Sequence, residues 1–342
     1  MAPENFKYLN LALQGDGSHG AFTWGVLHRL LEDERLRIEG ISSVSSGAMN
    51  ACVMVSGYLN GGRAAAQANL AVFWKEVADQ YSKMFASDIA SLWQKAVGFD
   101  HSGQLDTYMT LTREFSPYQL NPFNLNPLRD VLNSIVDFER LRADHSIRLH
   151  IGATQVRTGK MRLFSNAELT ADVLLASACI PTLHQAIEID NEPYWDGGYS
   201  GNPPLYPLVF ESLHPDVLIV LLQPLVRDTL PKTAEEIRKR AHELSFTNTF
   251  LREMRAIMMS KQKIKLNWLR SGELERRLNR LNLHLIEDSH HNSRDTHSRL
   301  NANDVFLDDL FKYGKRATAK WLKKHYKDVG QRSSMDMVQL FS

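Results

Sequence analysis

The stretch I-E-G-I-S-S-V-S-S-G-A-M-N, residues 38–50, decides the fold. Its apolar start predicts a short strand, and the apolar run from Ala48 to Val55 predicts a buried helix. A turn of small residues centred on Ser45 joins the two. A strand, a tight turn and a helix with a serine at the apex form a nucleophile elbow, which places a hydroxyl at the top of a sheet. The local pattern is S-V-S-S-G rather than G-x-S-x-G, because Ser43 occupies the place of the first glycine.

A glycine-rich loop precedes the elbow. Residues 9–13 (L-N-L-A-L) predict a first buried strand, and Q-G-D-G-S-H-G at 14–20 leads into a helical pattern. Such a loop presents backbone N–H groups at the positive end of a helix dipole, where an anion binds. A nucleotide-binding turn would need an acidic residue about 20 positions further on, near Glu39, where the chain instead enters the Ser45 turn. We therefore interpret the loop as an oxyanion hole.

A third motif lies far along the chain. In E-P-Y-W-D-G-G-Y-S-G-N-P-P, residues 192–204, Asp196 follows an aromatic pair and precedes two glycines. We expect its carboxylate at a loop apex with little steric cover. An Asp-Gly turn is common without any catalytic role, so this motif gains weight only beside the other two.

Together the three motifs resemble the patatin-like phospholipase family of lipid acyl hydrolases. That family carries a G-G-G-x-[R/K]-G loop, a G-x-S-x-G elbow and a distal D-G-G/A, which correspond here to residues 15–20, 43–47 and 196–198. The resemblance implies a Ser–Asp dyad without a histidine. Ser45 would be the nucleophile and Asp196 the base.

The oxyanion loop departs from the family pattern at two positions. Asp16 replaces the middle glycine, and His19 replaces the basic residue. A carboxylate about 6 Å from a developing oxyanion, at an effective dielectric near 20, would cost about 3 kcal/mol, which is roughly a hundredfold in rate. Because Asp tolerates positive φ better than most residues, we expect its side chain to point outward, toward His19 or solvent. The predicted oxyanion donors are the backbone N–H groups of Gly15, Asp16, Gly17 and Ser46.

Composition and length describe an ordinary globular protein. The chain has 342 residues, of which 43% are hydrophobic, and its formal net charge of +1 gives no overall field that favours nucleic acid. Cys52 and Cys179 stand in apolar runs, which predicts buried thiols in a reducing compartment. The N-terminus lacks a signal-peptide pattern, and no apolar run is long enough to span a membrane. We expect a cytoplasmic protein that needs neither a metal nor an organic cofactor.

The resemblance extends over roughly residues 8–225 and implies an α/β fold with a mostly parallel central sheet sandwiched by helices. We expect residues 1–230 to form this patatin-like catalytic domain, and residues 231–342 to form a mainly helical region packed on it. The run D-V-L-I-V-L-L-Q at 216–223 predicts a central strand. Residues 282–286 predict a further strand.

Other elements are predicted from periodicity. The alternating runs 147–156 and 160–164 predict a hairpin. Residues 126–142 predict one helix with an apolar face, and residues 303–326 predict helices broken near Gly314.

Two segments allow more than one interpretation. Residues 80–127, rich in aromatic residues and Met, form either a helical excursion packed on the core or a cap whose apolar inner face receives an acyl chain. Residues 251–270 are basic and amphipathic, so they either pack on their own domain or make a peripheral contact with an anionic membrane. The histidines of residues 287–300 lack the paired spacing of a metal site.

The predicted function is serine-dependent hydrolysis of a lipid acyl ester, of the phospholipase A, lipase or esterase type. Two alternatives stay open. One is an α/β-hydrolase with a Ser–Asp–His triad that uses one of the thirteen histidines, for instance His184. The other is a lipid-binding protein that kept the fold and lost activity through Asp16.

Overall fold

The centre of the molecule is one mixed β-sheet. The computed structural model describes residues 6–86, 111–112, 114–227, 230–266, 272–290 and 298–341. The strands are β1 Lys7–Leu13, β2 Leu36–Ser43, β3 Arg148–Gln155, β4 Met161–Ser165, β5 Ile187–Ile189, β6 Glu192–Asp196, β7 Asp216–Leu221 and β8 Asn282–Glu287. Their order is β5-β6-β3-β2-β1-β7-β8, and β4 pairs with β3.

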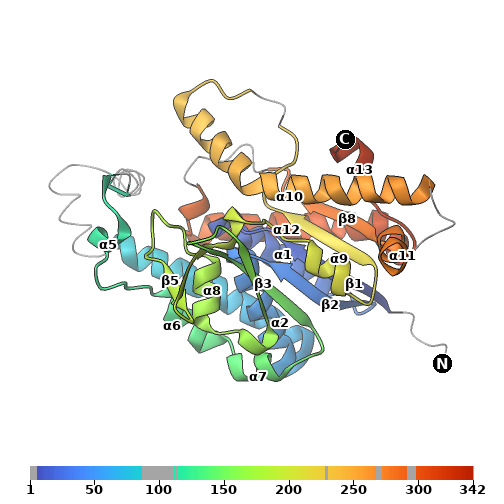
Figure 1. Cartoon of the computed structure of the whole chain (residues 1–342). Coiled ribbons are helices and arrows are strands. Elements are labelled where there is room, and N and C mark those ends of the chain that lie inside the picture. Colours follow the sequence, from blue (N-terminus) through green and yellow to red (C-terminus); the bar gives the residue numbers. More distant parts are fainter. Residues whose placement is uncertain are drawn as a thin grey trace.

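The five strands from β3 to β8 along this order are mutually parallel, and β4, β5 and β6 add antiparallel pairs beside β3. Figure 1 shows helices on both faces of the sheet. The predicted α/β fold is therefore confirmed. The predicted hairpin is also confirmed as β3 and β4, and the strands predicted at 216–223 and 282–286 are β7 and β8.

The helices are α1 Gly20–Leu31, α2 Ser45–Ala86, α5 Pro117–Leu120, α6 Leu128–Ile135, α7 Phe138–Ala143, α8 Ala171–Ser177, α9 Tyr206–Glu211, α10 Ala234–Leu266, α11 Glu273–Arg280, α12 Asp304–His325 and α13 Met337–Phe341. Helices α1, α2 and α12 contribute to the core on one face of the sheet, and α9 and α10 contribute to the core on the other. None of the helices in the described ranges is long and apolar enough to cross a membrane.

Successive side chains of the central strands point to opposite faces of the sheet and so contribute to two separate cores. In β1, Leu11 and Leu13 belong to the core with α1 and α2, whereas Ala12 belongs to the core with α9 and α10. In β7, Val220 and Ile219 divide between the two cores in the same way. Both strands are thus buried on both faces, which explains their nearly continuous apolar sequence.

Two predicted helices differ from the structure. The helix predicted over 126–142 is interrupted at Asp137, whose carboxylate accepts from the Arg140 N–H at 3.0 Å and so begins α7. The predicted break near Gly314 is wrong, because α12 continues through it. A Cβ at Gly314 would collide with the Phe22 carbonyl, so this glycine allows α12 to pack closely on α1.

The C-terminal region completes the fold. Strand β8 extends the central sheet beside β7, and α12 packs along α1. Ile286, Leu307 and Leu310 belong to the same core cluster as Leu11. Of the segment 80–127, predicted as either a helical excursion or a cap, residues 87–110 and 113 lie outside the described residues, and the described part contains α5.

Candidate active site

Ser45 is the first residue of α2 and follows β2 almost directly. Its φ is +53°, a conformation that costs an L-residue about 1–2 kcal/mol. The Ser45 N–H donates to Ser177 Oγ at 2.8 Å, and that hydroxyl donates to the Gly152 carbonyl at 2.7 Å. The strained turn is therefore held in place by α8 and β3, as a nucleophile elbow requires.

Small residues allow the backbone to pass closely around Ser45. A Cβ at Gly15 would lie 2.5 Å from the Ser45 Cβ, so the glycine-rich loop lies directly against the nucleophile candidate. A Cβ at Gly47 would lie 2.6 Å from the Leu13 carbonyl, where α2 passes β1. Ser43 is fully buried, and among the described residues its hydroxyl has no hydrogen-bond partner.

Asp196 ends β6 and is only 2% exposed. Its N–H donates to the Cys179 carbonyl at 2.8 Å, and its Oδ1 accepts from the Gly198 N–H at 2.7 Å. The expectation of a poorly covered loop apex is wrong, because β6 pairs with β3 and the Phe246 ring lies against Gly198. Asp196 is therefore a buried residue and not an exposed one as expected.

Burial raises the pKa of Asp196 to about 7. The Gly198 N–H and the Ser45 hydroxyl each lower this pKa by hydrogen bonding to the carboxylate, and the neighbouring Asp16 carboxylate raises it. The structure thus brings Ser45 and Asp196 together, although they are far apart in sequence. Across the described part of the chain, no histidine forms a hydrogen bond to either side chain. His184, the histidine considered for a triad, is half-buried, and desolvation lowers its pKa.

The glycine-rich loop is fixed by side chains from other elements. Asn202 binds Gly15 twice, because its Oδ1 accepts from the Gly15 N–H at 2.8 Å and its Nδ2 donates to the Gly15 carbonyl at 2.9 Å. The Asp16 N–H donates to Ser46 Oγ at 3.2 Å. Gly17 has a φ of +55°, and a Cβ there would collide with the Arg299 carbonyl. The loop therefore has one defined conformation beside Ser45.

The Asp16 side chain is turned toward His19, as expected. Asp16 Oδ2 lies 2.8 Å from His19 Nδ1, and His19 Nε2 lies 3.0 Å from the hydroxyl of Ser298, the first residue of the short 3-10 helix Ser298–Leu300. The side chains of Asp16 and His19 are both less than a tenth exposed. A carboxylate, an imidazole and a hydroxyl thus connect the glycine-rich loop to the C-terminal region.

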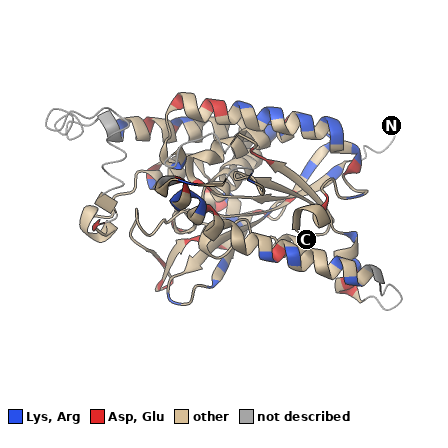
Figure 2. Cartoon of the chain, turned by 90° about the horizontal axis from the view of Figure 1, so that it is seen from above, with Lys and Arg blue, Asp and Glu red and all other residues tan. Residues whose placement is uncertain are grey.

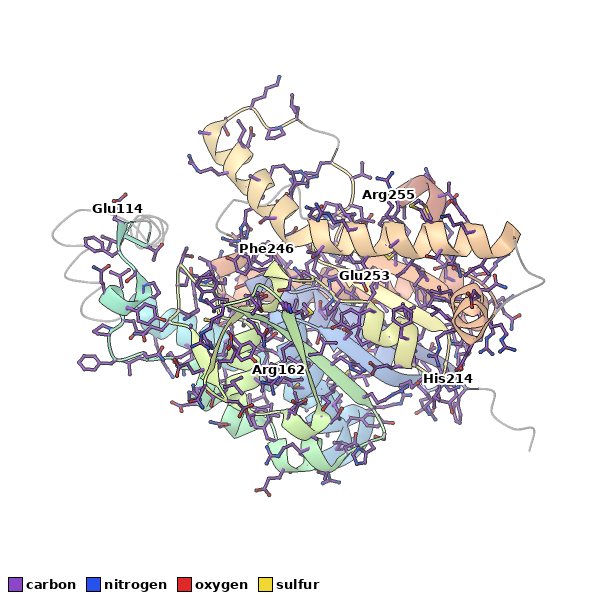
Figure 3. The ribbon with its side chains drawn as sticks, in the orientation of Figure 1. Glu114, Arg162, His214, Phe246, Glu253 and Arg255 are labelled. Atoms are coloured by element: carbon purple, nitrogen blue, oxygen red, sulfur yellow. The ribbon has the colours of Figure 1, made fainter. Side chains whose placement is uncertain are left out.

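Helix α10 covers the turn that carries Asp196. Figure 3 shows Phe246 on the side of α10 that faces the sheet. Its ring lies 4.8 Å from the Tyr199 ring and 4.5 Å from the His242 ring, measured between centroids. Burial and the adjacent Arg299 guanidinium lower the pKa of His242 to about 4, so this imidazole is neutral near pH 7. The C-terminal region therefore adds aromatic side chains beside the turn that carries Asp196, with the Arg299 guanidinium against His242.

Sequence reasoning missed two supporting residues. Ser177 belongs to the segment A-S-A-C-I-P at 176–181 and holds the Ser45 turn, and Asn202 follows the D-G-G motif and holds Gly15. The sequence pointed to them only indirectly, because Ser177 lies in a segment typical of the family and Asn202 lies six residues after Asp196. Among the described residues no group of three His, Cys, Asp or Glu side chains is placed to hold a metal ion. Of the histidines in 287–300, His291 and His297 lie outside the described residues.

In the described part of the basic segment 251–270, residues 251–264 pack their apolar face on the rest of the protein. Its apolar members Met254, Ile257 and Met258 are buried in the core under α10. Lys261 Nζ donates to the Leu278 carbonyl at 2.7 Å, at the end of α11. Residues 267–270 lie outside the described residues.

The outer side of α10 is charged. Figure 3 shows Arg255 on the side that faces away from the sheet and Glu253 on the side that faces it. The Glu253 carboxylate accepts from the Leu205 N–H at 3.0 Å. Any membrane contact of this helix would therefore use charged outer residues and not its apolar face.

Comparisons with known proteins place this chain beside one family and one solved structure. The family model described as Patatin-like phospholipase matches residues 11–209, a range that includes Ser45, Asp196 and the glycine-rich loop. The crystal structure of VipD from Legionella pneumophila is a similar structure, with a TM-score of 0.41 and 16% sequence identity, and the match covers 94% of this chain and 67% of that chain. No curated protein matches the sequence.

Proposed function

Because the chain belongs to the patatin-like phospholipase family, we propose that it hydrolyses lipid acyl esters with Ser45 as nucleophile and Asp196 as general base. The observation that supports this most strongly is the contact between these two residues. A serine in a strained elbow lies beside a buried carboxylate whose pKa is raised to about 7. A general base works best when its pKa lies near the operating pH.

In the first half of the reaction, Asp196 accepts the Ser45 proton while Oγ attacks the acyl carbonyl carbon. The tetrahedral intermediate then expels the alcohol part of the lipid, which takes the proton from Asp196 and leaves an acyl-enzyme. In the second half, Asp196 accepts a proton from water, and the hydroxide attacks the acyl carbon. Collapse releases the fatty acid, and the Ser45 oxygen regains its proton.

The oxyanion would be held by backbone N–H groups of the glycine-rich loop and the elbow. The Gly15 N–H is engaged by Asn202, so Asp16, Gly17 and Ser46 supply the donors in this proposal. The weak contact from the Asp16 N–H to Ser46 Oγ, 3.2 Å long, would yield to a stronger bond with an oxyanion. A preorganised donor of this kind contributes about 3–4 kcal/mol.

The geometry disfavours the two alternatives. A Ser–Asp–His triad needs a histidine bound to the carboxylate, and within the described ranges Asp196 has none. A protein inactivated through Asp16 needs that carboxylate beside the oxyanion, whereas it is paired with His19.

We also propose a reducing, cytoplasmic location, because Cys52 and Cys179 are both free and buried. Burial raises the pKa of the Cys179 thiol to about 12, so it is not a reactive thiolate near pH 7. A peripheral contact of α10 with anionic lipid would rest on the outer charges Arg252, Arg255 and Lys263. Under this proposal such a contact is electrostatic and is lost at high salt.

Hydrolysis of a soluble short-chain ester tests the dyad. Ser45→Ala and Asp196→Asn should each lower kcat by at least about a thousandfold. Ser42→Ala is the matched control, because it also removes a buried serine hydroxyl close to the elbow. A Ser45→Ala protein that keeps more than about a tenth of the wild-type kcat would contradict the proposal.

A further inference from the structure

The stretch from Phe115 to Leu128 contains no charged residue, although Glu114 and Arg129 flank it. We call residues 115–125, which include α5, the apolar tip. Its exposed large apolar side chains are Phe115, Tyr118, Leu120, Phe123 and Leu125. Phe123 is 84% exposed and Leu125 is 71% exposed. A group of exposed apolar side chains of this kind usually marks a surface that binds something.

The apolar tip projects from the molecule. Figure 1 shows α5 at the left, standing off the sheet and the helices that cover it. In Figure 2 the same segment lies at the left and is mostly tan. The tip thus offers side chains that protrude, whereas the apolar face of α10 is buried in the protein.

Several backbone polar groups of the tip are paired within it. Asn121 bonds Leu125 twice, with Nδ2 donating to the carbonyl at 2.8 Å and Oδ1 accepting from the N–H at 3.0 Å. The Ser116 N–H donates to Gln119 Oε1 at 2.9 Å, and Pro117 has no N–H to satisfy. A segment whose polar groups are already paired enters an apolar medium at a lower cost than one with free groups.

The apolar tip is attached to the loop that supports Asp196. Gln185 Nε2 donates to the Asn121 carbonyl at 2.7 Å, and the Ala186 N–H donates to the Tyr118 hydroxyl at 3.3 Å. Gln185 is in turn bound through its carbonyl to the Cys179 thiol, 3.1 Å away. The Cys179 carbonyl accepts from the Asp196 N–H. A surface that contacts the apolar tip would therefore lie close to the loop that holds Asp196.

We propose that the apolar tip inserts into an electrically neutral lipid surface, such as a phosphatidylcholine bilayer, and thereby brings ester bonds to Ser45. This inference rests on the proposed acyl hydrolase function, whose substrate lies in such a surface. The absence of charge from Phe115 to Leu128 matches zwitterionic headgroups and gives no preference for anionic ones. Apolar burial and not ion pairing supplies the attraction, with Phe123 and Leu125 as the principal anchors.

Binding to vesicles of pure phosphatidylcholine tests the proposal without relying on catalysis. We expect the wild-type protein to float with these vesicles, and about 1 M salt to leave the bound fraction unchanged, because salt screens charges only. Phe123→Ala/Leu125→Ala should weaken binding by at least about tenfold, since two large apolar side chains no longer leave water. The matched control is Leu213→Ala/Val305→Ala. Leu213 is 80% exposed and Val305 is 75% exposed, and both lie outside the apolar tip.

Activity separates the apolar tip from the dyad. Phe123→Ala/Leu125→Ala should keep its rate on a soluble ester and lose at least about tenfold on phospholipid in vesicles. Ser45→Ala should bind vesicles like wild type, and an active Ser45→Ala protein would refute the proposed function while leaving the binding test valid.

The proposal is wrong if wild-type protein does not bind neutral vesicles, or if the double tip variant binds as well as the control. It is also wrong if sedimentation shows a wild-type dimer that Phe123→Ala/Leu125→Ala dissociates, because a second copy of the chain would then cover the tip.

Discussion

In the proposed mechanism, His19 holds the Asp16 side chain away from the place where negative charge develops. The contact between His19 Nδ1 and Asp16 Oδ2 is 2.8 Å long and largely buried. His19→Ala removes this partner and frees the Asp16 carboxylate to turn toward the reacting carbonyl. We predict that the variant loses kcat through the charge of Asp16 and not through the loss of the imidazole itself.

The expected loss follows from Coulomb's law. A carboxylate about 6 Å from an oxyanion, at an effective dielectric of about 20, costs about 3 kcal/mol. The corresponding rate factor is about a hundredfold. Asp16 is close enough to the site for its charge to raise the pKa of Asp196, so the interaction is not screened away. His19→Ala should therefore lower kcat by about ten- to a hundredfold.

A double-mutant cycle isolates the charge. His19→Ala/Asp16→Asn should recover kcat to within about threefold of wild type, and Asp16→Asn or Asp16→Gly alone should change kcat by less than about threefold. Ser298→Ala is the control, because it removes the hydrogen bond between His19 and Ser298 and keeps the contact between His19 and Asp16. Thermal unfolding of each variant separates a catalytic loss from a folding loss. If the double variant is as slow as His19→Ala, the reasoning is refuted.

Three further predictions concern buried groups. The rate kcat/KM should rise with pH through about 7, because Asp196 must lose its proton to act as base; a midpoint near the ordinary Asp pKa of about 4 would contradict the assignment. Burial raises the pKa of Asp196 in the folded state, so protonation of this residue favours folding. This contribution to the free energy of unfolding is fully present below about pH 4 and is lost as the pH rises through about 7. Asp196→Asn should therefore stabilise the protein by roughly 4 kcal/mol at pH 8 and by little at pH 4. Thermal unfolding at the two pH values measures this, and equal effects at both would count against a buried charge. Ser43→Ala should raise the free energy of unfolding by about 1 kcal/mol, because among the described residues it removes a buried hydroxyl without a hydrogen-bond partner. A urea titration measures this, and a decrease would mean that the hydroxyl is hydrogen-bonded.

Local patterns predicted the parts of the site that are local in sequence. The elbow at Ser45 and the glycine-rich loop each consist of a few consecutive residues whose backbone conformation depends on their small side chains. The outward turn of Asp16 was predictable for the same reason, since its partner His19 is three residues away. The D-G-G motif identified Asp196 but not its burial, because α10 covers it from a distant part of the sequence.

The supports of the site were beyond sequence reasoning because they bridge distant segments. Asn202 binds Gly15 across 187 positions, and Ser177 binds Ser45 across 132. A single sequence contains no periodicity that pairs such residues. Gly314 was misinterpreted for a related reason, since its lack of a side chain serves the packing of α12 on α1 and does not end the helix.

The central claim is that Ser45 is a nucleophile activated by Asp196, and a fluorophosphonate probe tests it most directly. The probe forms a covalent bond only with an activated serine, and mass spectrometry of the digested protein identifies the labelled residue. We predict stoichiometric labelling at Ser45 in the wild-type protein and labelling at least about a hundredfold slower in Asp196→Asn. Labelling at Ser298, which lies beside His19, or no labelling of folded protein at all, would contradict the claim.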